Sequence, residues 1–176
     1  NMAVWRPCDT AESLVAWAEA AKAADHPSCL IFSRQNLPFV ERSEQQLADI
    51  QRGAYVLSAA EGNAQAVIIA TGSEVALALE AQAELAKQGV AVNVVSMPST
   101  NVFDKQDAAY QNSVLPQDLP RVAVEAGVTD GWYKYVGLNG KVVGLDRFGE
   151  SAPAEELFEF FGITTANVVA AVKSVL

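Results

Sequence analysis

The stretch from Ala66 to Ser99 constrains the fold of this chain more than any other part of the sequence. It opens with Ala66 to Ala70, a continuous apolar run that is too short for a helix and rich in β-branched residues. Such a run is typical of a strand that is buried on both faces. Thr71-Gly72-Ser73 interrupts the run, and Ser73 is well placed to cap a helix that begins at Glu74 and ends before Gly89.

A second apolar run, from Val90 to Met97, follows this helix. A strand, a helix and a strand within about thirty residues are typical of a right-handed βαβ unit with parallel strands. Shorter apolar runs predict three further strands, at 54–57, 121–125 and 142–145. The strand at 54–57 is expected to be antiparallel and at or near an edge, because a short loop joins it to the next strand. The sequence thus predicts an α/β fold of three αβα layers, with helices on both faces of a mixed, mostly parallel, five-stranded sheet.

Helix signals continue through the C-terminal third of the chain. A helical turn or two is expected at 107–112, and a short helix at 129–136. Ser151 is expected to cap a helix that has Pro153 in its first turn and runs to Phe161. Thr164 or Thr165 is expected to cap the last helix, whose valines at 168, 169 and 172 would face inward.

A smaller strand–helix–strand pattern occupies residues 1–33. Strands are expected at 3–5 and 29–32, the latter buried, around a helix at 11–24 that Asp9 or Thr10 caps. The apolar side of this helix would consist of Leu14, Val15 and Trp17. The polar composition that follows is typical of a linker. The predicted organisation is therefore a small α/β element at 1–37, a linker at 38–53 and a main domain at 54–176.

The charge balance narrows the classes of partner. A net charge of −9 argues against nucleic-acid and anionic-membrane partners, because both need clustered positive charge. No apolar run approaches the roughly twenty residues that span a bilayer, and we recognise no signal peptide. Cys8 and Cys29 lack CxxC spacing and are expected to be reduced thiols of a cytoplasmic protein. Because an Asn precedes the first Met, we expect the chain to be a piece of a longer protein.

Few side chains stand in sequence patterns that are typical of catalytic, anion-binding or metal-binding sites. The turn at 71–73 could hold an anion at a helix N-terminus, but a capped strand-to-helix turn is the simpler interpretation. His26 is the only histidine, and with two distant cysteines it cannot complete a zinc site. Glu125 and Glu150 could act as general acids or bases, although carboxylates in such places more often cap a helix or pair with an arginine.

Arg34 differs from these positions. It directly follows a predicted strand and is flanked by Ser33, Gln35 and Asn36. Parallel α/β sheets place ligands beyond the carboxyl ends of their strands, and a guanidinium suits bidentate contact with a phosphate or carboxylate. A structural ion pair is the alternative interpretation of Arg34.

A set of longer motifs, taken together, resembles a known family. The motifs are NMxxWRPCDxxES, LIFSRQNLP, GxYVL, IIATGSEV, VVSMPST, FDKQDAAYQxSVLP, VAVEAG, WYKYVGLNG and FGESAPAxxLFxFFGIT. They span essentially the whole chain and resemble bacterial transketolase. The resemblance implies that residues 1–37 correspond to the end of the family's pyrimidine-binding domain and residues 54–176 to its C-terminal domain.

The resemblance also implies a function. Transketolase transfers a two-carbon ketol unit between sugar phosphates in the pentose phosphate pathway, and it works as a homodimer with thiamine diphosphate and a divalent cation, magnesium or calcium. Arg34 matches the family's SRQNL arginine, which contacts the substrate phosphate. The family's catalytic and cofactor-binding residues lie upstream, so we expect no catalytic, cofactor or metal residues here and no activity of this chain by itself.

Two alternatives stay open at this point. One is a non-catalytic module that binds an anion or nucleotide through the turn at 71–73. The other is a related thiamine diphosphate enzyme, although such enzymes are not expected to carry the SRQNL and FGESAP motifs. In either case the short strands near Val4 and Ile31 lack the rest of a sheet. We therefore expect residues 1–45 to be poorly ordered or held by another chain.

Overall fold

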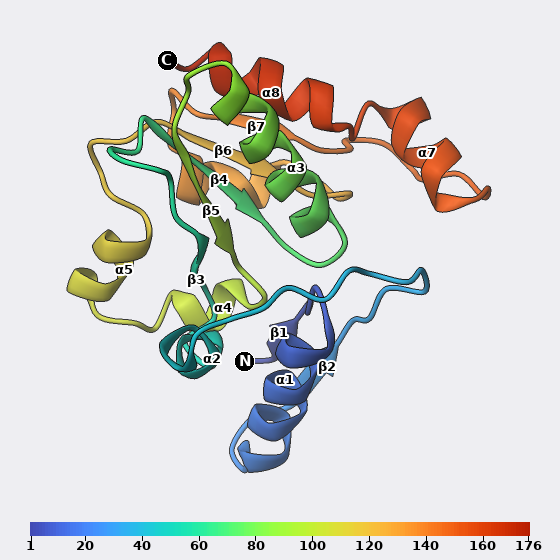
Figure 1. Cartoon of the computed structure of the whole chain (residues 1–176). Coiled ribbons are helices and arrows are strands. Elements are labelled where there is room, and N and C mark those ends of the chain that lie inside the picture. Colours follow the sequence, from blue (N-terminus) through green and yellow to red (C-terminus); the bar gives the residue numbers. More distant parts are fainter.

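The structure, a computed structural model, describes all 176 residues, and a five-stranded sheet lies between two layers of helices (Figure 1). The strands are β1 (Ala3–Trp5), β2 (Ser28–Leu30), β3 (Tyr55–Ser58), β4 (Ala66–Ala70), β5 (Val92–Ser96), β6 (Arg121–Val124) and β7 (Lys141–Val143). The α-helices are α1 (Thr10–Lys22), α2 (Glu44–Ile50), α3 (Glu74–Lys87), α4 (Thr100–Phe103), α5 (Ala108–Val114), α6 (Tyr133–Val136), α7 (Ala154–Phe161) and α8 (Thr165–Lys173). A 3-10 helix, η1 (Asp130–Trp132), precedes α6.

The predicted βαβ unit is confirmed and forms the centre of the large sheet. The strand order is β3-β5-β4-β6-β7, and β4 pairs in parallel with both β5 and β6. All five residues of β4 are buried, as a strand covered on both faces must be. β3 is the one antiparallel strand and lies at the edge, where it pairs with β5.

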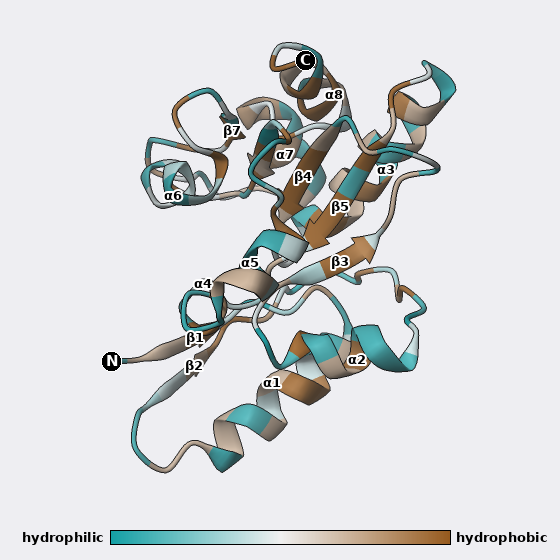
Figure 2. Cartoon of the chain, turned by 90° about the vertical axis from the view of Figure 1, so that its left-hand side faces the viewer, coloured by the Kyte–Doolittle hydropathy of each residue, from teal (hydrophilic) through white to brown (hydrophobic).

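Helices cover both faces of the sheet, so the predicted three-layer α/β class is confirmed. Alternate residues of β4 point to opposite faces: Ile68 belongs to one core, and Val67 and Ile69 belong to the other. The first core is completed by α3 and α8, which pack against each other. The second core is completed by α4, α5, η1 and α6. In Figure 2 the central strands are mostly coloured as hydrophobic, whereas the covering helices alternate between the two colours.

Two predicted helix caps differ from the structure. Ser73 occupies the N-cap of α3, but its hydroxyl bonds the Glu74 carboxylate at 2.5 Å and caps no backbone N–H. α7 begins at Ala154, so the predicted cap at Ser151 is wrong. Pro153 disfavours helical backbone at the residue before it and is itself extended, and the first helical turn therefore starts after the proline.

The N-terminal segment forms a separate two-stranded sheet in which β1 and β2 are parallel. The expectation of a buried strand at 29–32 is wrong, because β2 ends at Leu30 and both Ile31 and Phe32 are nearly half exposed. No further layer of this chain covers that face. The helix α1 likewise exposes Leu14 and Trp17, and the Trp17 ring stacks on that of Phe32.

The free edge of β1 is closed by a side chain rather than by another strand. The Asn101 carboxamide accepts a hydrogen bond from the Val4 amide and donates one to the Met2 carbonyl, each 3.0 Å long. The carboxamide thus pairs with β1 as a peptide group of a neighbouring strand would. In addition, the Arg6 amide donates to the Pro98 carbonyl. These bonds attach the small sheet to α4 and to the loop between β5 and α4.

The segment 38–53, which its composition describes as a linker, contains the helix α2. A complete capping box begins this helix, because Ser43 and Gln46 exchange side-chain to backbone hydrogen bonds. Ile50, at the end of α2, is fully buried in the first core, which α3 and α8 complete. The segment is therefore packed against the domain that follows it.

Candidate functional site

Arg34, the predicted ligand for a phosphate, lies in the loop that follows β2. The residue is exposed, and its guanidinium forms no ion pair or side-chain hydrogen bond within the chain. A structural ion pair, the alternative interpretation of Arg34, is therefore absent among the residues described. The guanidinium retains its full set of donors for an external partner.

The turn at 71–73 is organised around a backbone carbonyl. The Gly72 amide and the Thr71 hydroxyl both donate to the carbonyl oxygen of Arg6, at 3.1 and 3.3 Å. The Glu74 carboxylate lies at the start of α3, where Ser73 and the Ala126 amide donate to it. An anion at this helix N-terminus would meet a buried carboxylate and an amide that is already used, so the geometry favours a structural turn.

Arg6 lies beyond the carboxyl ends of β4 and β6 and joins two carboxylates. Its guanidinium forms an ion pair with Glu125 and lies 3.6 Å from Glu74. The Trp132 indole N–H donates to the same Glu125 carboxylate. The expectation that Glu125 pairs with an arginine is confirmed. Burial raises the pKa of the Glu74 carboxyl, an effect that is opposed by the hydrogen bonds from Ser73 and Ala126 and by the charge of Arg6.

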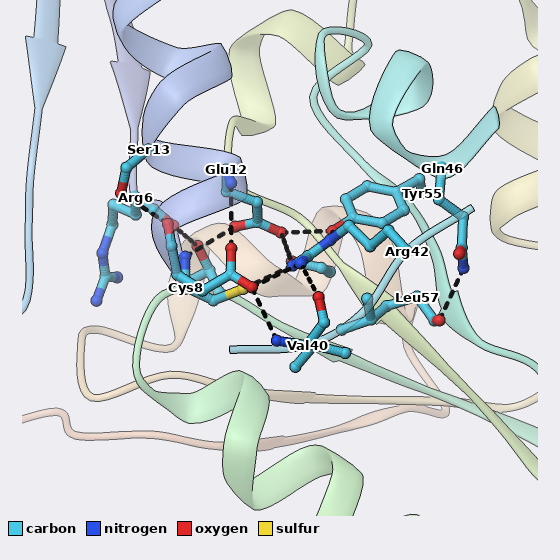
Figure 3. Close-up of polar contacts among 12 residues, drawn as sticks. Arg6, Cys8, Glu12, Ser13, Val40, Arg42, Gln46, Tyr55 and Leu57 are labelled. Carbon is cyan, nitrogen blue, oxygen red and sulfur yellow. Dashed lines mark hydrogen bonds and ion pairs between the residues drawn. The ribbon is translucent and has the colours of Figure 1, made fainter. Parts of the chain in front are cut away.

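A second ionic group joins α1 to the segment before α2 (Figure 3). Arg42 Nη1 donates to Asp9 Oδ2 at 2.6 Å, and Arg42 Nη2 lies 3.6 Å from Glu12 Oε1. All three charged side chains are at most 2% exposed. Arg42 also donates to the Tyr55 hydroxyl at 2.6 Å, and Figure 3 shows the contacts that surround the Arg42 guanidinium. Arg42 therefore connects the first helix of the chain to the edge strand β3.

Glu12 extends this group into the large sheet. Its carboxylate accepts hydrogen bonds from the Tyr55 hydroxyl at 2.8 Å and the Ser96 hydroxyl at 2.6 Å. Its other oxygen accepts the amide of Cys8. Burial, together with the nearby carboxylates of Glu12 and Asp9, raises the pKa of the Cys8 thiol well above its ordinary value. We call Asp9, Glu12, Arg42, Tyr55 and Ser96 the junction network.

The remaining candidates carry no cluster of functional groups. His26 contacts the carboxylate of Asp25, and Glu150 pairs with Arg147 at the surface, as expected for a structural carboxylate. Both cysteines are free thiols. No three His, Cys, Asp or Glu side chains converge in an arrangement that could hold a metal ion. None of the helices combines the length and the apolar character needed to cross a membrane.

Comparison with known families decides the assignment. Residues 53–164, more than half of the chain, match the family described as "Transketolase-like TK C-terminal domain". The chain belongs to this family. Transketolase 1 of Escherichia coli (strain K12) is 59% identical over the whole chain, and Transketolase 1 of Aliivibrio fischeri is 57% identical. The chain spans 27% of the length of each of these transketolases.

Solved transketolase structures share the fold. The enzyme from Pichia Stipitis in complex with sedoheptulose-7-phosphate matches 99% of the chain with a TM-score of 0.91 and 40% identity, and the chain covers 25% of it. The transketolase of Campylobacter jejuni matches with a TM-score of 0.87 and 39% identity, with 26% of it covered. A "split gene transketolase, inactive beta4 tetramer" matches the entire chain with a TM-score of 0.77 at 28% identity, with 58% of that chain covered.

The sequence does not predict the junction network or the group formed by Arg6, Glu74, Glu125 and Trp132. Asp9 is recognised from the sequence only as a helix cap, a role that it does fill. Arg42 stands in a polar stretch that gives no signal of burial, because its partners lie some thirty positions away in the chain. The sequence places Glu125 at the end of a strand, and only the fold brings Arg6 to it.

Proposed function

We propose that this chain is the C-terminal portion of a transketolase, whose full-length form transfers a two-carbon ketol unit between sugar phosphates. The observation that carries the proposal is the match over all 176 residues to transketolases at 55–59% identity. The sugar phosphate in the related Pichia Stipitis structure supports this class of substrate. In this proposal, residues 1–37 close the pyrimidine-binding domain, 38–53 link it onward, and 54–176 form the C-terminal domain.

The family implies thiamine diphosphate and a divalent cation, magnesium or calcium, in the full-length enzyme. The residues of this chain do not fit either group, because no three potential metal ligands converge and the glycine turn before α3 has the Glu74 carboxylate at the start of the helix. We therefore assign neither group to these residues. In the proposal, both are bound by other parts of the longer, homodimeric enzyme, and this chain alone is inactive.

Arg34 is the substrate-binding residue that we propose for this chain. Its support is threefold: it follows a strand of a parallel sheet, it is exposed, and its guanidinium has no partner within the chain. A sugar phosphate offers the planar guanidinium two oxygens, and the pair of charge-assisted bonds adds directional specificity. Arg34 would then bind the end of the sugar that does not react.

The proposal is tested by replacing Arg34 with Ala in the full-length enzyme. The KM for phosphorylated sugars should rise by at least about tenfold, because one charged hydrogen-bonding partner contributes roughly 1.5–3 kcal/mol. The KM for an unphosphorylated ketol donor should stay within about twofold, because that donor has no phosphate to lose. Arg34→Lys should fall between Ala and wild type, since it keeps the charge and loses the bidentate geometry.

A matched control separates Arg34 from a general charge effect. Arg147→Ala removes an exposed arginine that contacts the Glu150 carboxylate and the rings of Phe160 and Phe161, and it should leave both KM values unchanged. An equal rise of KM for phosphorylated and unphosphorylated donors would remove Arg34 from the phosphate site. Ketol transfer by the 176-residue chain without other polypeptide would contradict the proposed division of labour.

The rival functions lack a supporting observation. An anion-binding module at 71–73 would require free hydrogen-bond donors. The donors of this turn already bond the Arg6 carbonyl and the Glu74 carboxylate. Calorimetry with phosphate and nucleotides tests this rival. Micromolar binding that Ser73→Pro abolishes and Arg34→Ala leaves intact would restore it.

A further inference from the structure

A cavity of about 320 Å³ lies beyond the carboxyl ends of the parallel strands β4, β5 and β6. From β4 the chain crosses to β5 on one side, and the later strand β6 pairs on the other side of β4, so the strand order reverses at this position. Open α/β sheets bind ligands at such reversal points. The volume falls within the usual range for small-molecule sites. No part of the function proposed above uses this cavity.

The lining divides into an apolar floor and a polar wall. Met97, Trp132 and Tyr135 are buried and give the floor an aromatic, apolar surface. The polar wall consists of Arg6, Thr71, Thr100, Asn101 and Glu125. Arg6 reaches the cavity from the N-terminal segment and points away from the junction network (Figure 3). The N-terminal segment therefore contributes part of the cavity wall, through Val4 and Arg6.

The charges around this cavity exclude an anionic ligand. Arg6 is the only cationic side chain in the lining, and it is already shared between Glu125 and the buried Glu74. Within the lining, the Glu125 carboxylate already neutralises the one guanidinium, and Glu74 contacts that guanidinium from outside the lining. No unpaired positive charge is left to hold a phosphate or carboxylate. A cation would have to displace Arg6 from an ion pair within the same wall. An uncharged ligand meets neither cost.

Hydroxyl groups suit the rest of the lining. Each hydroxyl donates one hydrogen bond and accepts others, so it can meet carboxylate and threonine oxygens and guanidinium N–H groups at the same wall. The C–H faces of a small polyol can pack on the rings of Trp132 and Tyr135. We propose that this cavity is a binding site for an uncharged, polyhydroxylated ligand of the size of a pentose or pentitol.

The test is a titration of the 15N-labelled 176-residue chain with D-ribose and with xylitol, followed by NMR. The indole N–H of Trp132 and the backbone amides of Thr71 and Thr100 should shift in a saturable way. The indole of Trp5, buried in the small sheet, and that of Trp17, exposed on α1, should not shift, and they serve as internal controls. Inorganic phosphate should leave the Trp132 signal unchanged.

Two glycines provide a matched pair of variants. A Cβ at Gly131, in the cavity wall, meets no atom within 4 Å, and the same is true of Gly149 in the loop before α7. Gly131→Leu should weaken polyol binding at least about tenfold, which is about 1.4 kcal/mol, whereas Gly149→Leu should bind as wild type. Val128→Arg, at an exposed position of the lining, should act like Gly131→Leu.

Three results would overturn the proposal. They are the absence of a Trp132 shift with either polyol, a saturable shift with phosphate alone, and wild-type polyol binding by both lining variants. None of these results bears on Arg34, because the two sites share no residue. The KM measurements on Arg34 variants and this titration therefore succeed or fail independently.

Discussion

The carboxylate of Asp9 and the guanidinium of Arg42 lie 2.6 Å apart and are both buried, although 33 positions separate them in the chain. Asp9 caps α1, and Arg42 precedes α2 and contacts Tyr55 of the edge strand β3. This ion pair therefore helps to hold the N-terminal segment against the large sheet. Each side chain is at most 2% exposed, so loss of one partner leaves the charge of the other buried.

We predict that Arg42→Met destabilises the chain by about 3–5 kcal/mol, because it leaves the carboxylates of Asp9 and Glu12 buried without a counter-charge. Urea unfolding measures the loss. Arg147→Met removes a surface pair and should cost less than about 1 kcal/mol. A loss of that small size for Arg42→Met would show that the junction network contributes little to stability.

We predict that the two cysteines differ in reactivity. Burial and the carboxylates of Glu12 and Asp9 raise the pKa of Cys8, so its nucleophilic thiolate is suppressed at pH 8, while Cys29 is partly accessible. Iodoacetamide followed by mass spectrometry should label Cys29 in the native chain and both cysteines in urea. Rapid native labelling of Cys8 would contradict the closed junction.

The buried carboxyl of Glu74 predicts a pH dependence. Burial raises its pKa above the ordinary value of 4.5 in the folded state, which therefore binds this proton more tightly than the unfolded chain. Stability from this group is highest below pH 4.5 and falls as the pH rises through the raised pKa. The free energy of unfolding of wild type minus that of Glu74→Gln should decrease over this interval. Urea unfolding at several pH values checks the sign, and an increase would refute it.

A glycine at the start of the matched domain predicts a strong local effect. Gly53 has φ +88°, and a Cβ there would lie 2.4 Å from the Ser99 carbonyl oxygen and 2.5 Å from the Phe103 amide. Gly62 has φ +90° with nothing within 4 Å. Gly62→Ala should cost about 1–2 kcal/mol for the left-handed backbone alone. Gly53→Ala should cost at least about 2 kcal/mol more, and equal losses in thermal unfolding would contradict the close approach.

The parts of the fold that could be predicted depend on neighbours in sequence. The strand at 66–70 and its helix are visible from the sequence because a doubly covered strand needs a continuous apolar run and its exit needs a turn. The predicted antiparallel direction and edge position of β3 are confirmed, but the short loop after β3 does not identify its partner, because β3 pairs with β5 and not with the next strand β4. The resemblance to transketolase, carried by long motifs, is confirmed by the family match.

The parts that could not be predicted depend on distant partners. Arg42 can be buried because Asp9 and Glu12 pair with it. The sequence of a polar stretch is the same whether its charged side chains face water or one another, so it does not predict this burial. The exposure of Ile31 and Phe32 reflects the absence of a covering layer, which no local pattern reports. The cavity at Arg6 forms between two sheets, so neither segment alone contains its signal.

The carboxamide of Asn101 fixes the direction in which the small sheet can be extended. The Val4 amide and the Met2 carbonyl, on the side of β1 that faces away from β2, are already hydrogen-bonded, so β1 has partners on both sides as an inner strand has. Only β2 keeps an unoccupied flank, since β1 is its sole neighbour. Any strand contributed by a longer polypeptide must therefore pair with β2, next to Cys29. The small sheet can be extended on this side alone.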